Sequence, residues 1–232
     1  MVVGEDLAII DQPNRKRLQL EVASKSRPQL ENLGKKFGGR IEKLPGDWLK
    51  RSLNQKTKPI QVGGKRLVIP AGAAFGTGEH PTTAMSLRLL EKLSRSCKDN
   101  WSMLDLGTGS GVLALAAKLL GATPVIAIDN DPVAISTAKQ NARLNRIRGA
   151  QFRVADVRKW KSSKSLDVLT ANLCSELLIE ILPKLKAARS LILSGFLRTQ
   201  ERDVRRALAL KKIDVVEARR RGKWVAVLAR CR

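Results

Sequence analysis

Residues 104–111 read Leu-Asp-Leu-Gly-Thr-Gly-Ser-Gly, and they decide the fold. An apolar run is followed by glycines at every second position and then by the apolar, alanine-rich stretch 112–120. This order predicts a buried strand, a tight turn and a helix. Glycine has no Cβ, so the turn can bend sharply and a ligand can approach its backbone. The alternative is a structural turn that binds nothing.

The spacing of the three glycines indicates which ligand the turn suits. A dinucleotide-binding turn has the pattern G-x-G-x-x-G, but position 112 is a valine. Gly107, Gly109 and Gly111 instead suit a nucleoside joined to an amino acid. Asp129 ends the next apolar run, 22 positions after Gly107, where a carboxylate can accept hydrogen bonds from both ribose hydroxyls.

Two further aspartates follow nearby apolar runs. Asp131 precedes Pro132, and it fits better as the N-cap of the next helix than as a ribose ligand. Asp156 ends the run 151–157. It is placed either to reach an adenine amino group or to stabilise a turn, and the sequence leaves both roles open.

The rest of the second half alternates strands and helices, which predicts an α/β fold with a parallel sheet and helices on both faces. A final hairpin should add an antiparallel strand, and ligands should bind at the carboxyl ends of the parallel strands. The expected strands are 101–107, 124–130, 151–157, 166–173 and 190–196, with a hairpin of 212–221 and 222–231. The expected helices are 110–121, 133–145, 175–188 with a kink or break at Pro183, and 199–210.

The first part of the chain has a different pattern. Residues 17–24, 27–39 and 40–45 predict a strand, a helix and a strand, and residues 60–70 predict a strand pair around Gly63-Gly64. We therefore expect a small α+β unit over 1–45, a linker and strand pair over 46–70, and the main domain over 71–232.

Two polar segments lie next to the predicted strands. Residues 74–83 read AFGTGEHPTT, in which Phe75 offers an apolar face and His80 offers a polar ring, or in which Thr82 or Thr83 merely caps a helix. Asn172 follows a strand and precedes a helix, so its amide oxygen could orient an amine nucleophile. We expect the neighbouring Cys174 to be a buried, inert cysteine.

Composition restricts the setting and the partners. The net charge of +23 favours contact with nucleic acid, ribosomes or acidic proteins, although a generally basic solvated surface explains it equally well. The three cysteines are scattered and His80 is the only histidine, so we expect no zinc site and a reduced, cytoplasmic setting. No apolar run is long enough for a membrane span, and the first residues do not resemble a secretory signal.

Residues from about 45 to the end resemble the bacterial PrmA family, the methyltransferases of ribosomal protein L11. The resemblance is carried by AFGTGEHPTTA at 74–84, LDLGTGSGVLALAA at 104–117, VIAIDNDPVA at 125–134, ANL at 171–173 and LSGFL at 193–197. It implies a class I methyltransferase fold with a seven-stranded mixed sheet, and S-adenosylmethionine (SAM) as the methyl donor, with S-adenosylhomocysteine as the product.

The resemblance also implies residue roles. Phe75, Thr77 and His80 would line the SAM site, Gly107 would face the methionine part, and Asn172 would lie at the amine that is methylated. The implied acceptors are lysine side chains or the N-terminal amine of a ribosomal protein. Another protein, a small molecule or RNA is the alternative acceptor. A basic, non-catalytic ribosome- or RNA-binding protein of the same fold is the alternative from another class.

Overall fold

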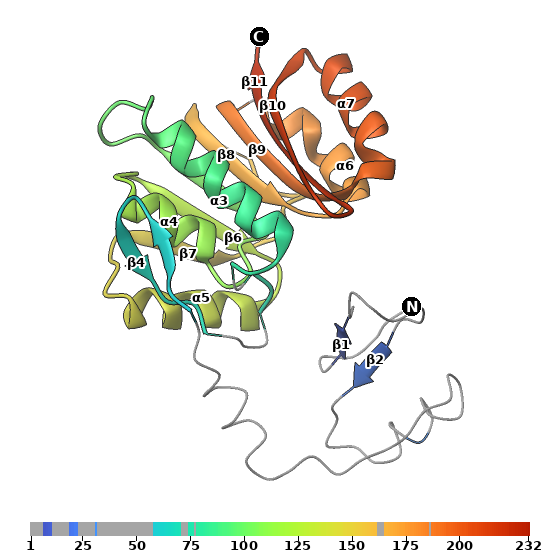
Figure 1. The fold of residues 1–232 in the computed structure, drawn as a ribbon. Helices are drawn as coiled ribbons and strands as arrows, with labels where there is room; N and C mark the ends of the chain where they lie inside the picture. Colours follow the sequence, from blue (N-terminus) through green and yellow to red (C-terminus); the bar gives the residue numbers. More distant parts are fainter. Residues whose placement is uncertain are drawn as a thin grey trace. The chain divides into compact units, whose positions relative to one another are not determined.

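The computed structural model describes residues 7–10, 19–22, 31, 58–70, 74–76, 78–161, 165–185 and 187–232 (Figure 1). The chain divides into two compact units, residues 1–49 and 50–232. In the first unit β1 (Leu7–Ile10) pairs antiparallel with β2 (Gln19–Val22), which lies within the predicted strand 17–24. The predicted helix 27–39, apart from helical Glu31, and the predicted strand 40–45 fall outside the described residues. The domain boundaries stay predictions.

The second unit contains a seven-stranded mixed sheet, as predicted. Its strand order is β10-β11-β9-β8-β5-β6-β7. Five strands run parallel, and β11 joins the sheet antiparallel to β9 and carries β10 at its outer side. The parallel strands are β5 (Met103–Leu106), β6 (Val125–Asp129), β7 (Ala150–Val154), β8 (Leu166–Asn172) and β9 (Ala188–Leu197). The hairpin consists of β10 (Ile213–Arg221) and β11 (Trp224–Cys231).

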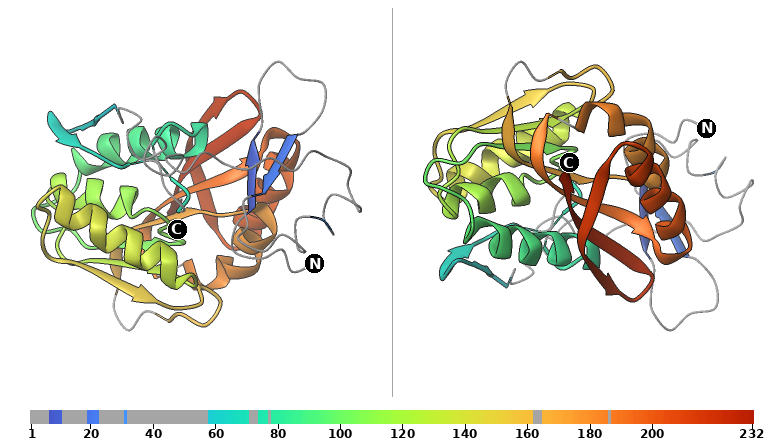
Figure 2. Two further views of the ribbon diagram at one scale, coloured as in Figure 1. Left: turned by 90° about the horizontal axis from the view of Figure 1, so that it is seen from below. Right: turned by 90° about the horizontal axis from the view of Figure 1, so that it is seen from above.

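Helices cover both faces of this sheet (Figure 2). Successive residues of a strand point to opposite faces, so Met103 of β5 belongs to one apolar core and Leu104 to the other. The first core includes α3 (Pro81–Ser94), α4 (Val112–Leu119) and part of α5 (Pro132–Leu144). The second core includes α6 (Ser175–Leu185) and α7 (Glu201–Leu210), the latter preceded by the short η1 (Arg198–Gln200).

The predicted strand pair before the sheet is confirmed. The strands β3 (Ile60–Val62) and β4 (Lys65–Leu67) pair antiparallel around Gly63-Gly64. Val62, Leu67 and Ile69 are buried in the first core together with residues of α3 and α4. No helix in the described ranges has both the length and the apolar character that crossing a membrane requires.

Helix ends agree with the sequence in some places and differ in others. Asp131 caps α5 by accepting a hydrogen bond from the Val133 N–H at 2.8 Å, as predicted. Pro183 does not break α6, because the helix continues past it to Leu185. The N-cap of α3 is His80 rather than Thr82 or Thr83.

A buried carboxyl group lies in the middle of the sheet. Asp105 of β5 is 1% exposed and accepts hydrogen bonds from the hydroxyls of Thr108 at 2.7 Å and Thr170 at 2.5 Å. Burial raises its pKa to about 6, and these hydrogen bonds limit the rise. Since Thr108 belongs to the glycine turn and Thr170 to β8, the carboxyl group ties the turn to the neighbouring strand.

The raised pKa of Asp105 makes stability depend on pH in a predictable direction. The native state binds the proton more tightly than the unfolded chain, so this group favours folding below about pH 4 and loses that contribution as the pH rises through 6. The Tm of Asp105→Asn should therefore rise relative to that of the unmodified protein as the pH increases from about 4 to 7. The corresponding gain in the free energy of unfolding has an upper limit of about 3 kcal/mol.

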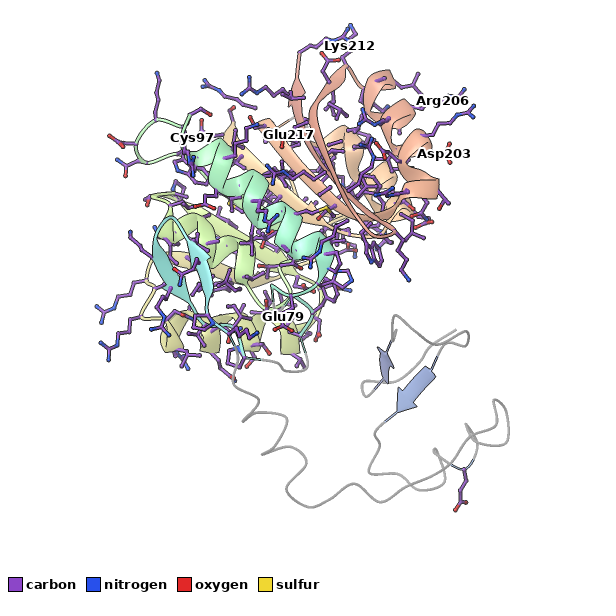
Figure 3. The ribbon with its side chains drawn as sticks, in the orientation of Figure 1. Glu79, Cys97, Asp203, Arg206, Lys212 and Glu217 are labelled. Atoms are coloured by element: carbon purple, nitrogen blue, oxygen red, sulfur yellow. The ribbon has the colours of Figure 1, made fainter. Side chains whose placement is uncertain are left out.

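Thermal unfolding followed by circular dichroism across this pH range measures the difference. The control is Asp203→Asn, a change at an exposed carboxylate on the outer side of α7 (Figure 3). Parallel curves of Tm against pH for Asp105→Asn and the unmodified protein would refute the assigned titration.

Candidate active site at the carboxyl edge of the sheet

Several predicted site residues lie at one edge of the sheet, where the parallel strands end. We call this edge the carboxyl edge. Gly107 follows β5, Asp129 ends β6 and Asn172 ends β8. These three strands are neighbours in parallel register, so their ends lie side by side. Ligands of open α/β sheets bind at this edge.

The glycine turn needs its glycines for space as well as for backbone conformation. Gly109 has a φ of +53°, and a Cβ on it would lie 2.5 Å from the carbonyl oxygen of Phe75. Gly111, with a φ of +83°, starts α4, and a Cβ there would lie 2.9 Å from the Cβ of Ala138 in α5. The turn is therefore packed between α5 and the segment 74–76, and side chains do not fit.

Ser110 joins the glycine turn to the segment 74–76. Its N–H donates to the Phe75 carbonyl at 2.9 Å, and its hydroxyl donates to the Gly76 carbonyl at 2.6 Å. Asn141 of α5 donates to the Ser110 carbonyl at 2.9 Å. The contacts of Ser110 and Asn141 were not predicted from the sequence, although a serine between two glycines of such a turn is a signal for them.

Asp129 faces the glycine turn, whereas Asp131 does not. One carboxylate oxygen of Asp129 accepts from the Gly109 N–H at 2.9 Å, and the other accepts from the Asp131 N–H at 3.1 Å. Each oxygen keeps a lone pair for a further donor. The side chain of Asp131 is occupied as the cap of α5.

Asp156 lies just beyond the neighbouring strand rather than at its end, because β7 stops at Val154. Its carboxylate accepts from the Arg158 N–H at 2.8 Å, which is the turn role that the sequence left open. The N–H of the preceding residue, Ala155, donates to the Asp129 carbonyl at 2.8 Å. Asp156 therefore lies one residue beyond a backbone hydrogen bond to the end of β6. Its contact with an adenine stays a prediction.

Aromatic rings connect the segment 74–80 to the C-terminal hairpin. The ring centroid of His80 lies 5.0 Å from that of Phe75 and 5.0 Å from that of Trp224, both in edge-on contact. Burial lowers the pKa of His80, and the charge of Lys223 lowers it further, so both favour the neutral ring. The Phe75 ring is 57% exposed. Thr77 lies outside the described residues, and Trp224 was not among the site residues predicted from the sequence.

The Asn172 side chain is held at the end of β8. Its oxygen accepts from the Ser194 hydroxyl at 2.9 Å, and its nitrogen donates to the Thr83 hydroxyl at 3.5 Å. The prediction of a buried Cys174 was wrong, because this residue is exposed. It immediately precedes α6, and its carbonyl accepts from the Leu178 N–H in the first turn.

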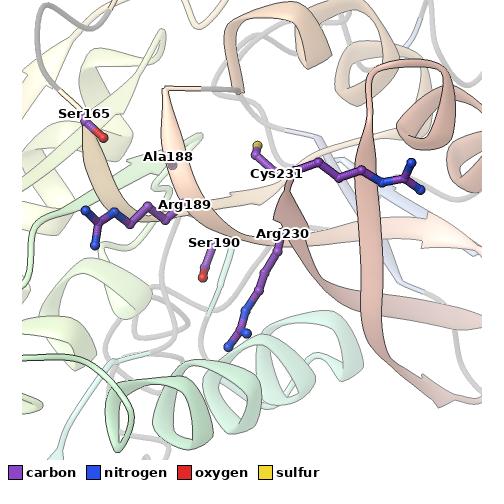
Figure 4. A pocket seen from close by; sticks show the side chains of 7 residues that line it. Ser165, Ala188, Arg189, Ser190, Arg230 and Cys231 are labelled. Atoms are coloured by element: carbon purple, nitrogen blue, oxygen red, sulfur yellow. The ribbon is translucent and has the colours of Figure 1, made fainter.

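Two surface pockets lie at the opposite edge of the sheet, where β9 begins and β11 ends. Their volumes are about 470 and 360 Å³, and both are lined by Arg189, Ser190 and Arg230 (Figure 4). They contain none of the predicted site residues. Within the described ranges, no three His, Cys, Asp or Glu side chains are grouped so that they could bind a metal ion.

Comparison with known proteins identifies relatives of this chain. The protein from Heliobacterium modesticaldum named ribosomal protein L11 methyltransferase is 40% identical over 167 residues, which is 70% of this chain and 52% of that protein. The Aquifex aeolicus protein of the same name is 34% identical over 91% of this chain and 86% of its own length. A solved structure, a ribosomal protein L11 methylase from Lactobacillus delbrueckii subsp. bulgaricus, has 29% identity and a TM-score of 0.62, covering 68% of this chain and 82% of the other.

The chain spans only about half to two thirds of the length of most of the curated relatives that it matches. The family model described as ribosomal protein L11 methyltransferase (PrmA) matches residues 53–232. This match covers the whole sheet and every predicted site residue, so the chain belongs to the PrmA family.

Proposed function

We propose that this protein transfers methyl groups from SAM to amines of a ribosomal protein of the L11 type. The observation that carries the proposal is the meeting of the glycine turn, Asp129 and Asn172 at one edge of a PrmA-family sheet. A lysine side chain or an N-terminal amine is the acceptor that the family resemblance favours, and its identity is part of the proposal.

The residues of the turn fit SAM. A Cβ on Gly109 would collide with the Phe75 carbonyl oxygen, so the turn keeps its shape only with glycine there, and its backbone would face the methionine part. The Asp129 carboxylate has lone pairs for the two ribose hydroxyls. Val112 is buried in the first turn of α4, at the position where a dinucleotide fingerprint requires glycine. Phe75, with its exposed ring, would cover the cofactor from the opposite side.

Asn172 would orient the acceptor amine. When bound, SAM supplies a methyl group on a positively charged sulfur, which an amine lone pair can attack. A lysine with a pKa of about 10.4 must first lose its proton, and an apolar pocket makes that loss easier. An oxygen of Asn172 that accepts one amine N–H would direct the lone pair, and positioning of this kind can contribute about 7–11 kcal/mol.

The proton would leave to water. Residues 171–175 contain no His, Asp or Glu, and the next carboxylate is Glu176. Hydrogen bonds from its own backbone N–H and from Ser175 hold the pKa of Glu176 below its usual value, which makes it a weak base. The network around Asn172 otherwise consists of hydroxyl groups.

The affinity for SAM distinguishes the proposed role of Asp129 from that of Asp131. Asp129→Ala should weaken SAM binding by roughly 10- to 100-fold, because charge-assisted hydrogen bonds contribute about 1.5–3 kcal/mol. Asp131→Ala is the matched control: it removes a helix cap, should lower stability by about 1 kcal/mol, and should leave the SAM dissociation constant nearly unchanged.

Isothermal titration calorimetry measures the SAM affinity of both variants, and thermal unfolding measures their stability. Equal weakening by the two changes would contradict the assignment of Asp129, and no SAM binding by the unmodified protein would favour a non-catalytic role.

Methyl transfer identifies the acceptor. We expect labelled SAM, incubated with ribosomal proteins and RNA from the same organism, to label one ribosomal protein on amine groups, located by mass spectrometry. Asn172→Ala should reduce the rate at least tenfold, with SAM binding retained, because the amine loses its acceptor. Label found in RNA, on another protein or on a small molecule would overturn the proposed acceptor, and an unchanged rate for Asn172→Ala would overturn the proposed role of that residue.

A further inference from the structure

A group of buried hydroxyls lies behind Asn172. Asn172 and Ser194 are direct partners in the register of β8 and β9, and Thr83 and Ser86 face them from α3. The three hydroxyl residues are at most 1% exposed. Figure 1 shows α3 lying across β8 and β9, so this polar group is enclosed by a helix and two strands.

With the Asn172 oxygen placed toward Ser194, the donor in each hydrogen bond follows. The Asn172 oxygen can only accept, so the Ser194 hydroxyl donates to it across 2.9 Å. Ser194 has one hydroxyl proton, and therefore Ser86 must donate in the 2.7 Å contact between the two serines. The contact of the Asn172 nitrogen with Thr83 is long, at 3.5 Å. Ser194 is thus the closer of these two side-chain partners of the amide.

The orientation of this amide decides what an acceptor amine meets. Exchange of oxygen and nitrogen by a half-turn of the amide leaves its shape almost unchanged. In one orientation an incoming amine meets an oxygen with a free lone pair, which can accept an N–H. In the other it meets an NH₂ group, which cannot, and the amine lone pair would be drawn toward the amide instead of toward the methyl group.

We propose that Ser194 is a positioning residue for methyl transfer, because its hydroxyl holds the Asn172 amide with the oxygen available to the acceptor amine. The inference rests on the proposed function. Ser194 is completely buried, so it acts through Asn172 and does not touch the substrate. In the transfer an N–C bond forms and the S–C bond breaks, the sulfur keeps the bonding electron pair, and the surplus proton on nitrogen goes to water. Ser194 keeps its own proton throughout.

Enzyme kinetics test this role. Ser194→Ala should lower kcat roughly tenfold, the effect of one neutral hydrogen bond, with SAM binding unchanged. Ser86→Ala should lower kcat less, because Ser194 keeps the proton that it donates. The matched control is Ser190→Ala, a buried serine at the other end of the same strand, which should leave kcat unchanged.

A double-mutant cycle distinguishes positioning from a general structural effect. In an Asn172→Ala background, Ser194→Ala should have no further effect on kcat, because the amide that it orients is gone. An equal loss of kcat in both backgrounds would overturn the proposal. An unchanged kcat for Ser194→Ala alone, or a larger loss for Ser86→Ala than for Ser194→Ala, would do the same.

A spectroscopic measurement keeps this test separate from the proposed function. The side-chain amide signals of Asn172 in a ¹⁵N–¹H spectrum should shift in Ser194→Ala and exchange faster with solvent, while those of Asn141 and Asn145 stay in place. Unmoved Asn172 signals would overturn the role of Ser194 whatever the protein methylates. Failure of the unmodified protein to transfer a methyl group is seen in the transfer assay itself and refutes the proposed function.

Discussion

The close packing around Gly109 is the constraint on which the rest of the site depends. Its N–H donates to Asp129, and its α-carbon lies so near the Phe75 carbonyl that no side chain fits. Three segments, from β5, from β6 and from the loop before α3, therefore meet at one backbone position. The register between β5 and β6 must be maintained for this contact, because a slip of one residue would turn every side chain of β6 to the other face.

The buried carboxyl group of Asp105 supports the same arrangement. Asp105 connects Thr108 of the turn with Thr170 of β8, so the turn is tied to the strand that ends in Asn172. The negative charge of Asp129 contributes to the raised pKa of Asp105. A full charge on Asp105 is unfavourable so close to the charge of Asp129. The two carboxyl groups therefore differ in their surroundings. Asp129 is accessible to a ligand, whereas Asp105 is enclosed and structural.

Much of the fold could be predicted because its signals are local. Parallel strands that are buried on both faces are continuous apolar runs, and a helix that starts with Asp131-Pro132 carries its own cap. The position of β11 between β9 and β10 was not predictable in this way. Either strand of the hairpin could pair with β9, and the hydrogen bonds would be satisfied equally well. His80 as the cap of α3 was missed because threonine caps helices more commonly than histidine.

The placement of Gly107, Asp129 and Asn172 at one edge of the sheet was predictable, because each comes at the end of an apolar run that forms a strand, and their roles stay predictions. The site was not predictable where it depends on a long-range pair. Ser86 and Ser194 are 108 positions apart, and each is an ordinary small residue within an apolar helix or strand. The same holds for Trp224, whose contact with His80 exists only because β11 lies beside β9.

The helix α3 connects the proposed cofactor side of the site with the proposed acceptor side. Residues 80, 83 and 86 are spaced by three, so they lie along one side of the helix start. His80 contacts Phe75 on the cofactor side, Thr83 contacts the Asn172 amide, and Ser86 contacts Ser194 behind it. Because one helix carries all three contacts, a shift of α3 would move the Phe75 segment and the group around the Asn172 amide together. In the proposed reaction, helix geometry would therefore set the distance between the methyl donor and the acceptor amine.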